Sequence, residues 1–318
     1  MSLHSNELVL GIDGGGSKTL ASLAVLSEGG DFHVVGRGTA GASNLNAIGI
    51  VPAAAAVQRA IELAFQSTGT QPRRVAALCM GMSGAGRAEE QQTWVNWAQE
   101  NQVAEQIDVV TDAETVLAAG TPEGIGVALI AGTGSLAYGM NQTGQIARAG
   151  GWGYLLGDEG GGYQIGLAAL KAIAKAVDGL GRETCLQSMI LHALGLDDPR
   201  ALIRYVYDHK SKRSDIAALT KLVFEAAENE DHVAREILQQ AVTELAELVQ
   251  VVVSRLHLTK ENYSLALTGG LLLQQREYRV SLLEQLHFQQ REPSSVECVD
   301  DSSLGAIRIA IRRLNAAE

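Results

Sequence analysis

Residues 8–27, LVLGIDGGGSKTLASLAVLS, decide the fold class of this chain. The apolar run 8–13 predicts a buried strand, and alternation over 19–27 predicts a second strand. Residues 14–18, GGGSK, form the turn between them, where glycine lets backbone N–H groups approach a phosphate without Cβ clashes. The turn departs from a P-loop, because Ser17 stands where that motif needs glycine and a strand follows instead of a helix.

The same arrangement returns in residues 127–141, VALIAGTGSLAYGMN, as strand, glycine turn and return strand. The stretch 132–137 also matches GxGxxA, but a dinucleotide fingerprint must open a helix, and a strand is predicted here. Each turn on its own fits a tight hairpin, for which glycine is the usual residue. Two hydroxyl-bearing glycine turns that each follow a buried strand favour a duplicated α/β protein with two phosphate loops.

The rest of the chain alternates between strand and helix signals. Further predicted elements are strands at 32–39, 74–84 and 107–114, helices at 53–65 and 89–99, helical periodicity over 163–250, a loop or helix junction at 208–215, a strand and glycine turn at 263–270, a strand at 294–299 and a helix at 304–314. No low-complexity linker separates the halves, which favours two domains meeting over a cleft. We expect domains at 1–118 and 119–318, with the C-terminal helix, about 304–318, packing on the first.

Composition narrows the class of protein. The 318 residues are 46% hydrophobic and 19% charged, as in an ordinary folded protein. A formal net charge of -11 disfavours general binding to nucleic acids or anionic membranes. The three cysteines lie far apart without CxxC spacing, which indicates a reducing compartment and no obvious metal cluster. We expect a soluble, cytoplasmic protein, since neither a membrane-spanning run nor a signal-peptide pattern occurs.

Three aspartates stand where phosphoryl transfer needs carboxylates. Asp13 ends a buried strand beside the first turn and could hold Mg²⁺ through water, or cap the turn. Asp112 lies between a strand and a helix, where a base or a helix cap would stand, and Thr111 would also serve as the cap. Asp158 lies in GGWGYLLGDEGGGYQIG, residues 150–166, whose glycines let the backbone close over a polar ligand. Alternatively, Asp158 or Glu159 starts the helix of residues 163–177.

In their order, the motifs GIDGGGSKT, TDAE, IAGTGS, GGWGYLLGDEG and LTGG resemble the N-acetylglucosamine kinase group of the BadF/BadG/BcrA/BcrD-type ATPases. That group belongs to the sugar kinase/Hsp70/actin superfamily, and the resemblance covers nearly the whole chain. It implies an α/β fold of two ribonuclease-H-like, actin-like ATPase domains around a nucleotide cleft. It also implies the cofactors ATP and Mg²⁺, an amino-sugar substrate and a homodimer.

The resemblance assigns roles to individual positions. Asp112 matches the catalytic base of the family, and Asp13 stays the candidate for Mg²⁺ from its position beside the first turn. The implied sugar contacts are Asn44, Asp112, Gly151, Trp152, Gly153 and Asp158. The implied nucleotide contacts are Gly14, Gly15, Gly16, Ser17 and Lys18 in the first loop, Gly132, Thr133, Gly134 and Ser135 in the second, and Gly269 and Gly270 in the adenosine loop.

The resemblance leaves alternatives. Glucosamine-specific relatives lack the GGWG…GDEG form, whereas N-acetylmuramic acid kinases share it, so glucosamine is disfavoured and N-acetylmuramic acid stays open. An ATPase that activates a partner enzyme would use the same fold. Reductase activators of this kind hold a cluster through paired cysteines, a set that this sequence does not contain. A sugar sensor without turnover is disfavoured by Asp112. We therefore expect ATP-dependent phosphorylation of N-acetylglucosamine to its 6-phosphate.

Overall fold

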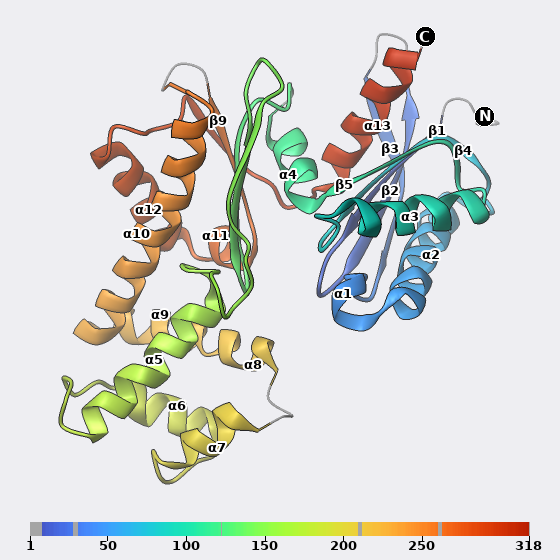
Figure 1. The fold of residues 1–318 in the computed structure, drawn as a ribbon. Helices are drawn as coiled ribbons and strands as arrows, with labels where there is room; N and C mark the ends of the chain where they lie inside the picture. The colour runs from blue at the N-terminus through green and yellow to red at the C-terminus, as the bar shows by residue number, and fades with distance from the viewer. Residues whose placement is uncertain (1–7, 28–30, 122, 209–211, 260–262, 318) are drawn as a thin grey trace. The chain divides into compact units, whose positions relative to one another are not determined.

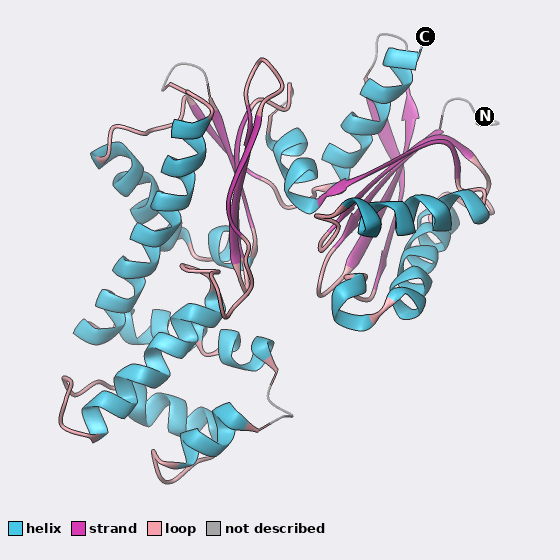
Figure 2. Cartoon of the chain, in the orientation of Figure 1, coloured by secondary structure: helices cyan, strands magenta, loops and turns pink. Residues whose placement is uncertain are grey.

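The computed structural model describes the chain except residues 1–7, 28–30, 122, 209–211, 260–262 and 318. The chain divides into two compact units, one of residues 1–125 with 299–318 and one of residues 126–298. We call them unit 1 and unit 2 and describe each by itself. Figure 2 shows that each unit combines a sheet with helices. No helix in the described ranges is both long and apolar enough to cross a membrane.

Unit 1 is a five-stranded sheet of order β3-β2-β1-β4-β5 with helices on both faces (Figure 1). Its strands are β1 (Leu8–Gly14), β2 (Thr19–Leu26), β3 (Phe32–Ala40), β4 (Val75–Met82) and β5 (Ala104–Thr111). Its helices are α1 (Leu45–Ile48), α2 (Ile50–Gln66), α3 (Ala88–Glu100), α4 (Asp112–Gly120) and α13 (Ser303–Ala317). Strands β1, β2 and β3 pair antiparallel, whereas β4 and β5 continue the sheet in parallel with β1.

Alternation along β1 sends its side chains into two separate cores. Leu8, Leu10 and Ile12 pack with α2 and α3, whereas Val9 packs with α13 on the opposite face. Close backbone contact holds α13 in place, since a Cβ on Gly11 would stand 2.3 Å from the Ser303 carbonyl oxygen. The helix at the C-terminus therefore packs directly on the N-terminal strand.

Unit 2 carries a five-stranded sheet of order β10-β9-β6-β7-β8. Its strands are β6 (Gly126–Ala131), β7 (Ser135–Met140), β8 (Ile146–Gly150), β9 (Ser264–Thr268) and β10 (Ser295–Cys298). Its helices are α5 (Gly162–Val177), α6 (Leu186–Leu194), α7 (Ala201–Tyr207), α8 (Arg213–Ala218), α9 (Thr220–Glu228), α10 (His232–Arg255), α11 (Gly270–Gln274) and α12 (Arg276–Phe288). One hydrophobic core joins this sheet to α5, α9, α10 and α12.

The two sheets share one topology, which confirms the predicted duplication. In each, the first three strands form an antiparallel meander, and two later strands join the first in parallel. The turn between β1 and β2 and the turn between β6 and β7 therefore occupy equivalent positions. The fold class predicted from the sequence is confirmed.

Some local expectations need correction. The helix α5 takes Gly161 as its N-cap, so the prediction that Asp158 or Glu159 starts this helix is wrong. Strand β8 has no counterpart among the predicted elements. Within the predicted junction 208–215, α8 begins at Arg213, and residues 209–211 lie outside the described residues.

Candidate active site

The first glycine loop, residues 14–18, is a tight hairpin with a packed base and an open tip. The Gly15 amide donates to the Lys18 carbonyl at 2.9 Å and closes the turn. A Cβ on Gly14 would stand 2.4 Å from Cε of Met82, whereas a Cβ on Gly16 would meet nothing within 4 Å. Gly16, Ser17 and Lys18 are exposed. The tip can therefore accept a ligand without a change in the core beneath it.

The sheet brings three chain segments to one edge. Gly14, Met82 and Thr111 are neighbours in register across the parallel strands β1, β4 and β5. Because parallel strands end at the same edge, the glycine loop, Ser83 and Asp112 follow side by side. The Ser83 amide donates to the Gly14 carbonyl at 2.8 Å, which ties β4 to the base of the loop.

Asn44 lies at the same edge, in the segment that follows β3. Its side-chain oxygen accepts the Asn46 amide at 3.0 Å and caps the short helix α1. Its amide nitrogen is 3.4 Å from Oγ of Ser83. The preceding residue, Ser43, is fully buried and donates its backbone amide to the Gly15 carbonyl at 3.0 Å. The loop, Asn44 and the end of β4 thus form one connected group.

Asp112 is the first residue of α4, and its neighbours cap that helix. The Glu114 carboxylate accepts the Thr111 amide at 3.0 Å and the Thr111 hydroxyl at 2.9 Å. Thr111 is the N-cap residue of α4, so Asp112 is not the helix cap, which was the alternative role considered for it. The Asp112 carboxylate accepts the adjacent Ala113 amide at 3.0 Å. A helix N-terminus stabilises this carboxylate as an anion.

Asp13 is a partly buried carboxyl group at the base of the same loop. The pKa of Asp13 is raised to about 6, chiefly by burial. The Ser302 hydrogen bond and the Lys18 charge oppose this rise, and the negative charges of Asp112 and Asp301 contribute to it. Asp112 and Asp301 act on Asp13 electrostatically, and a cation at Asp13 would relieve that repulsion. Asp301 is itself held by Arg37 at 2.5 Å and caps α13 through the Ser303 amide at 3.1 Å.

The second glycine loop, residues 132–135, is joined to the start of α5. The Gly162 and Tyr163 amides donate to the carbonyls of Gly132 and Thr133 at 2.8 and 2.9 Å. The Ser135 hydroxyl donates to the Glu159 carbonyl at 2.5 Å. The second glycine loop thus supplies hydrogen-bond acceptors to the first turn of α5. The Ser135 hydroxyl also ties this loop to the GDEG segment, residues 157–160.

Asp158 reaches back from the GDEG segment onto this loop. Its backbone is left-handed, with φ of +66°, and a Cβ on Gly134 would stand 2.4 Å from its Oδ2. Its Oδ1 accepts the Gly153 amide at 3.3 Å. Burial raises the pKa of Asp158, and the Glu159 charge adds to this, while the Gly153 and Ser135 amides and Arg213 oppose it. The structure therefore groups Gly134, Gly153 and Asp158.

Trp152 stands out from the loop that contains it. Its side chain is 73% exposed, with Leu155 and Leu156 of the same loop 79% and 77% exposed. Gly151 and Gly153, on either side of Trp152, both have positive φ, of +67° and +88°. Trp152 therefore presents a flat apolar wall on a short loop that has glycine on either side of it.

The third glycine turn, at Gly269 and Gly270, lies beside the second loop. Strands β6 and β9 run parallel, with Ile130 paired to Thr268, so their following turns are neighbours. A Cβ on Gly269, whose φ is +95°, would stand 2.3 Å from the Ala131 carbonyl oxygen. The Gly270 amide lies 4.0 Å from an ideal Cβ on Gly132. At position 269 only glycine fits, because the backbone is left-handed and the Ala131 carbonyl leaves no room for a Cβ.

The structure thus collects the sequence-predicted residues into one group per unit. Unit 1 holds Asp13, residues 14–18, Asn44 and Asp112, and unit 2 holds residues 132–135, 151–153, Asp158 and residues 269–270. Sequence reasoning missed side chains that support these groups: Ser302 at Asp13, Ser83 at Asn44, Arg148 at Gly151 and Gln164 at the Trp152 loop. Their contacts come from the fold, and no local motif marks these residues.

The chain is similar to known proteins over nearly its whole length. The profile of the BadF/BadG/BcrA/BcrD ATPase family matches residues 10–293. The chain is 34% identical over 302 residues to the N-acetylmuramic acid/N-acetylglucosamine kinase of Clostridium acetobutylicum, covering 95% of this chain and 97% of that protein. It is also 34% identical to the N-acetyl-D-glucosamine kinase of Dictyostelium discoideum, covering 96% and 98%. A proposed N-acetylglucosamine kinase from Chromobacterium violaceum has a similar structure, with a TM-score of 0.74 and 27% identity over 97% of this chain and 100% of that one.

Proposed function

Because the chain belongs to the BadF/BadG/BcrA/BcrD ATPase family, we propose that it transfers the γ-phosphoryl group of ATP to the 6-hydroxyl of N-acetylglucosamine. The observation that carries this proposal is nearly full-length similarity, at 34% identity, to two kinases whose names both include that sugar. The grouping of an acidic residue, an amide side chain and a glycine loop at one sheet edge supports it.

In the proposed reaction Asp112 accepts the proton of the 6-hydroxyl as its oxygen attacks the γ-phosphorus. The new bond joins that oxygen to phosphorus, the bond from phosphorus to the β–γ bridging oxygen breaks, and ADP leaves with the electron pair. Thr111 and Glu114 cap α4 and fix its first turn, so Asp112 is held on a rigid element. The helix N-terminus favours its ionised form, which a proton acceptor needs.

The glycine loops are the proposed contacts of ATP. Gly16, Ser17 and Lys18 present backbone N–H groups, a hydroxyl and a cation at an exposed tip. Residues 132–135 and the turn at Gly269 and Gly270 lie together at the ends of β6 and β9. Such turns bind phosphate oxygens through backbone amides, which supports their assignment to the nucleotide.

The residues at Asp13 fit a magnesium ion. Mg²⁺ prefers oxygen ligands, keeps several waters and is bound through one or two carboxylates together with phosphates. Asp13 supplies such a carboxylate beside the first loop, where Asp112 and Asp301 add negative charge. When bound, the ion would neutralise charge on the phosphate oxygens.

The proposed sugar contacts are Asn44 and Asp112 of unit 1 and residues 151–153 and Asp158 of unit 2. The acetamido group has an apolar methyl and a donor–acceptor pair, and the exposed Trp152 side chain offers an apolar surface to the methyl. N-acetylmuramic acid is a second candidate substrate, because the Clostridium relative is named for both sugars.

The test is product analysis with MgATP and each of N-acetylglucosamine, N-acetylmuramic acid, glucosamine and glucose. The proposal expects ADP and N-acetylglucosamine 6-phosphate in equal amounts, identified by mass spectrometry and phosphorus NMR. ADP formed without any sugar phosphate would contradict it and would favour an ATPase that activates a partner enzyme.

A further inference from the structure

The loop that carries Trp152 is held to α5 by the Gln164 side chain and by an edge-to-face contact of Tyr154 with Tyr163, whose ring centroids are 5.0 Å apart. The Gln164 amide nitrogen donates to the Tyr154 carbonyl and to the Gly157 carbonyl, each at 3.0 Å. Both neighbours are acceptors, which fixes the orientation of the amide with its nitrogen toward the loop. Two points of the loop, three residues apart, are thereby tied to a single atom.

Gln164 itself stands on a rigid support. It is the third residue of α5, whose first turn is bonded to residues 132 and 133 of the second glycine loop. Its neighbours Tyr163 and Ile165 are buried in the core of unit 2. The amide therefore relates the position of the Trp152 loop directly to that of the second glycine loop.

The rest of the loop is bound at its ends and through the Tyr154 ring, which packs against the core of unit 2 and whose centroid lies 5.0 Å from the Arg213 guanidinium carbon. The Arg148 guanidinium donates to the Gly151 carbonyl at 2.7 Å, and the Tyr278 hydroxyl donates to the Gly160 carbonyl at 3.0 Å. Within the loop, the Leu156 and Gly157 amides both donate to the Gly153 carbonyl, at 3.1 and 2.9 Å. Trp152, Leu155 and Leu156 of this turn are exposed, whereas Tyr154 packs on the core. Gln164 adds hydrogen bonds to the backbone of the turn at Tyr154 and Gly157.

We propose that Gln164 is a positioning residue that fixes the Trp152 loop and, through it, the preference for an acetamido sugar. This inference rests on the proposed function, because it assigns a cause for selectivity at the same site. Gln164 does not itself touch the reacting atoms. It acts by holding the backbone of residues 153–157 in one shape, since a loop that is ordered before binding loses less entropy on binding.

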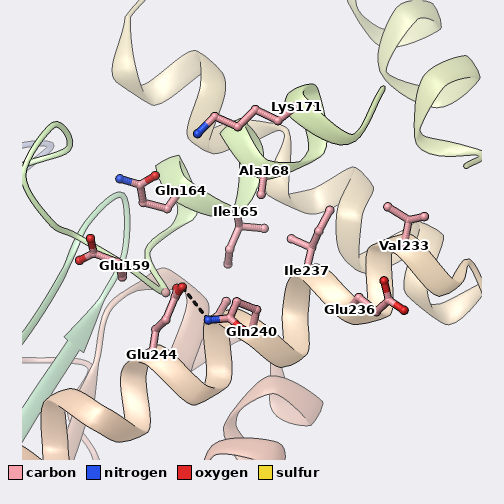
Figure 3. A pocket seen from close by; sticks show the side chains of 12 residues that line it. Glu159, Gln164, Ile165, Ala168, Lys171, Val233, Glu236, Ile237, Gln240 and Glu244 are labelled. Atoms are coloured by element: carbon pink, nitrogen blue, oxygen red, sulfur yellow. Dashed lines mark hydrogen bonds between the residues drawn. The ribbon is translucent and has the colours of Figure 1, made fainter. Parts of the chain in front are cut away.

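A second glutamine close to Gln164 offers a matched control. Gln164 lines a groove of about 350 Å³ between α5 and α10, together with Gln240 of α10 (Figure 3). The Gln240 amide donates to Glu244 of its own helix at 3.0 Å. In Figure 3 the Gln164 amide points away from Gln240 and Glu244. Replacing Gln240 thus removes a glutamine from the groove and leaves the Trp152 loop as it is.

Three variants test the proposal: Gln164→Leu, Gln164→Glu and Gln240→Leu. Leucine removes both donors, and glutamate keeps the shape but sets a carboxylate against two carbonyl oxygens. The first readout is amide hydrogen exchange of a peptide covering residues 151–160. We expect exchange there to accelerate on the order of tenfold in both Gln164 variants, as for the loss of ordinary hydrogen bonds. A peptide from α10 and the Gln240→Leu variant should stay at the wild-type rate.

The second readout is the ratio of kcat/KM for N-acetylglucosamine to that for glucose. We expect this ratio to fall on the order of tenfold in the Gln164 variants, with KM for ATP within about twofold of wild type. Wild-type exchange in both Gln164 variants would overturn the proposal, as would an unchanged ratio. A wild-type enzyme that phosphorylates no sugar would refute the proposed function, and accelerated exchange would still support the positioning of the loop. If Gln164→Leu fails to fold, the isosteric Gln164→Glu variant decides.

Discussion

The Asp158 carboxylate lies directly against Gly134, so close that a Cβ on this glycine would stand 2.4 Å from Oδ2. Gly134 belongs to the second glycine loop, and Asp158 also accepts the Gly153 amide beside Trp152. Within unit 2, one carboxylate therefore joins the proposed phosphate loop to the proposed sugar loop. A change at Gly134 must disturb both.

This contact predicts different outcomes for two glycine variants. In Gly134→Ala the new methyl group displaces Asp158, so we expect weaker binding of both ATP and N-acetylglucosamine. In Gly16→Val the side chain enters open space, since nothing lies within 4 Å of an ideal Cβ. It should obstruct phosphate approach alone and weaken ATP binding by at least about tenfold with unchanged sugar binding. Calorimetric titration of each ligand into each variant measures both effects. Equal loss of both ligands in Gly16→Val would contradict the assignment of the first loop.

Variants at Asp112 and Glu114 test catalysis and helix stability separately. Asp112→Asn should lower kcat by roughly 10²–10⁴-fold, as for loss of a general base, with little change in melting temperature. Glu114→Ala removes the capping box with Thr111 and should destabilise the protein by about 1 kcal/mol. Steady-state kinetics and thermal unfolding of both variants provide the measurement. Asp112 would be excluded as the base if its variant turned over at the normal rate.

Asp13 should make stability depend on pH in a defined direction. Its pKa is about 6 in the folded state, against a reference of 3.8, so the native state binds more protons than the unfolded state between these values. The free energy of unfolding therefore falls as pH rises through this window. Above pH 6 the folded state bears the full free-energy cost of an ionised, buried Asp13. Asp13→Asn removes that cost, so at pH 8 it should be more stable than wild type by at most about 3 kcal/mol. The gain should vanish below about pH 4.

The measurement is urea unfolding of wild type and Asp13→Asn at several pH values without nucleotide. A pH-independent difference between the two proteins would show that Asp13 titrates normally. Since Asp13 is also the proposed magnesium residue, the same variant should need more Mg²⁺ for half-maximal ATP turnover.

Trp152 and Leu155 provide a test of the apolar wall. Both are largely exposed on one loop, so neither truncation removes core packing. We expect Trp152→Ala to narrow the preference for N-acetylglucosamine over glucose and to leave ATP affinity unchanged, with Leu155→Ala as the control. The comparison uses kcat/KM for both sugars at saturating MgATP. Equal effects of the two substitutions would argue against a particular role for Trp152.

Local sequence signals predicted the strands and turns of this fold well. The glycine turns after 8–13 and 127–131 each follow an apolar run, and both are hairpins in the structure. Strand β8 was missed because its short sequence, IARAG, has no strand pattern and becomes a strand by pairing with β7. The glycine-rich segment before α5 was misread because acidic residues usually cap helices, whereas here Gly161 does.

The supporting side chains of the site could not be predicted in the same way. Ser302 is close to Asp13 only because α13 packs on β1 at Gly11, from the far end of the chain. Gln164 meets the Trp152 loop only after that loop folds back along α5. Such contacts depend on three-dimensional packing, so a single sequence offers motifs for the loops but none for what holds them.

The most direct test of the proposed function is a comparison of kcat/KM for N-acetylglucosamine, glucosamine and glucose at saturating MgATP. A site built to hydrogen-bond the acetamido group leaves polar groups unpaired when that group is absent, which is costly. We predict that N-acetylglucosamine is preferred over both other sugars by at least about tenfold. A higher kcat/KM for glucosamine or glucose would contradict the assignment of residues 150–158 as the acetamido site.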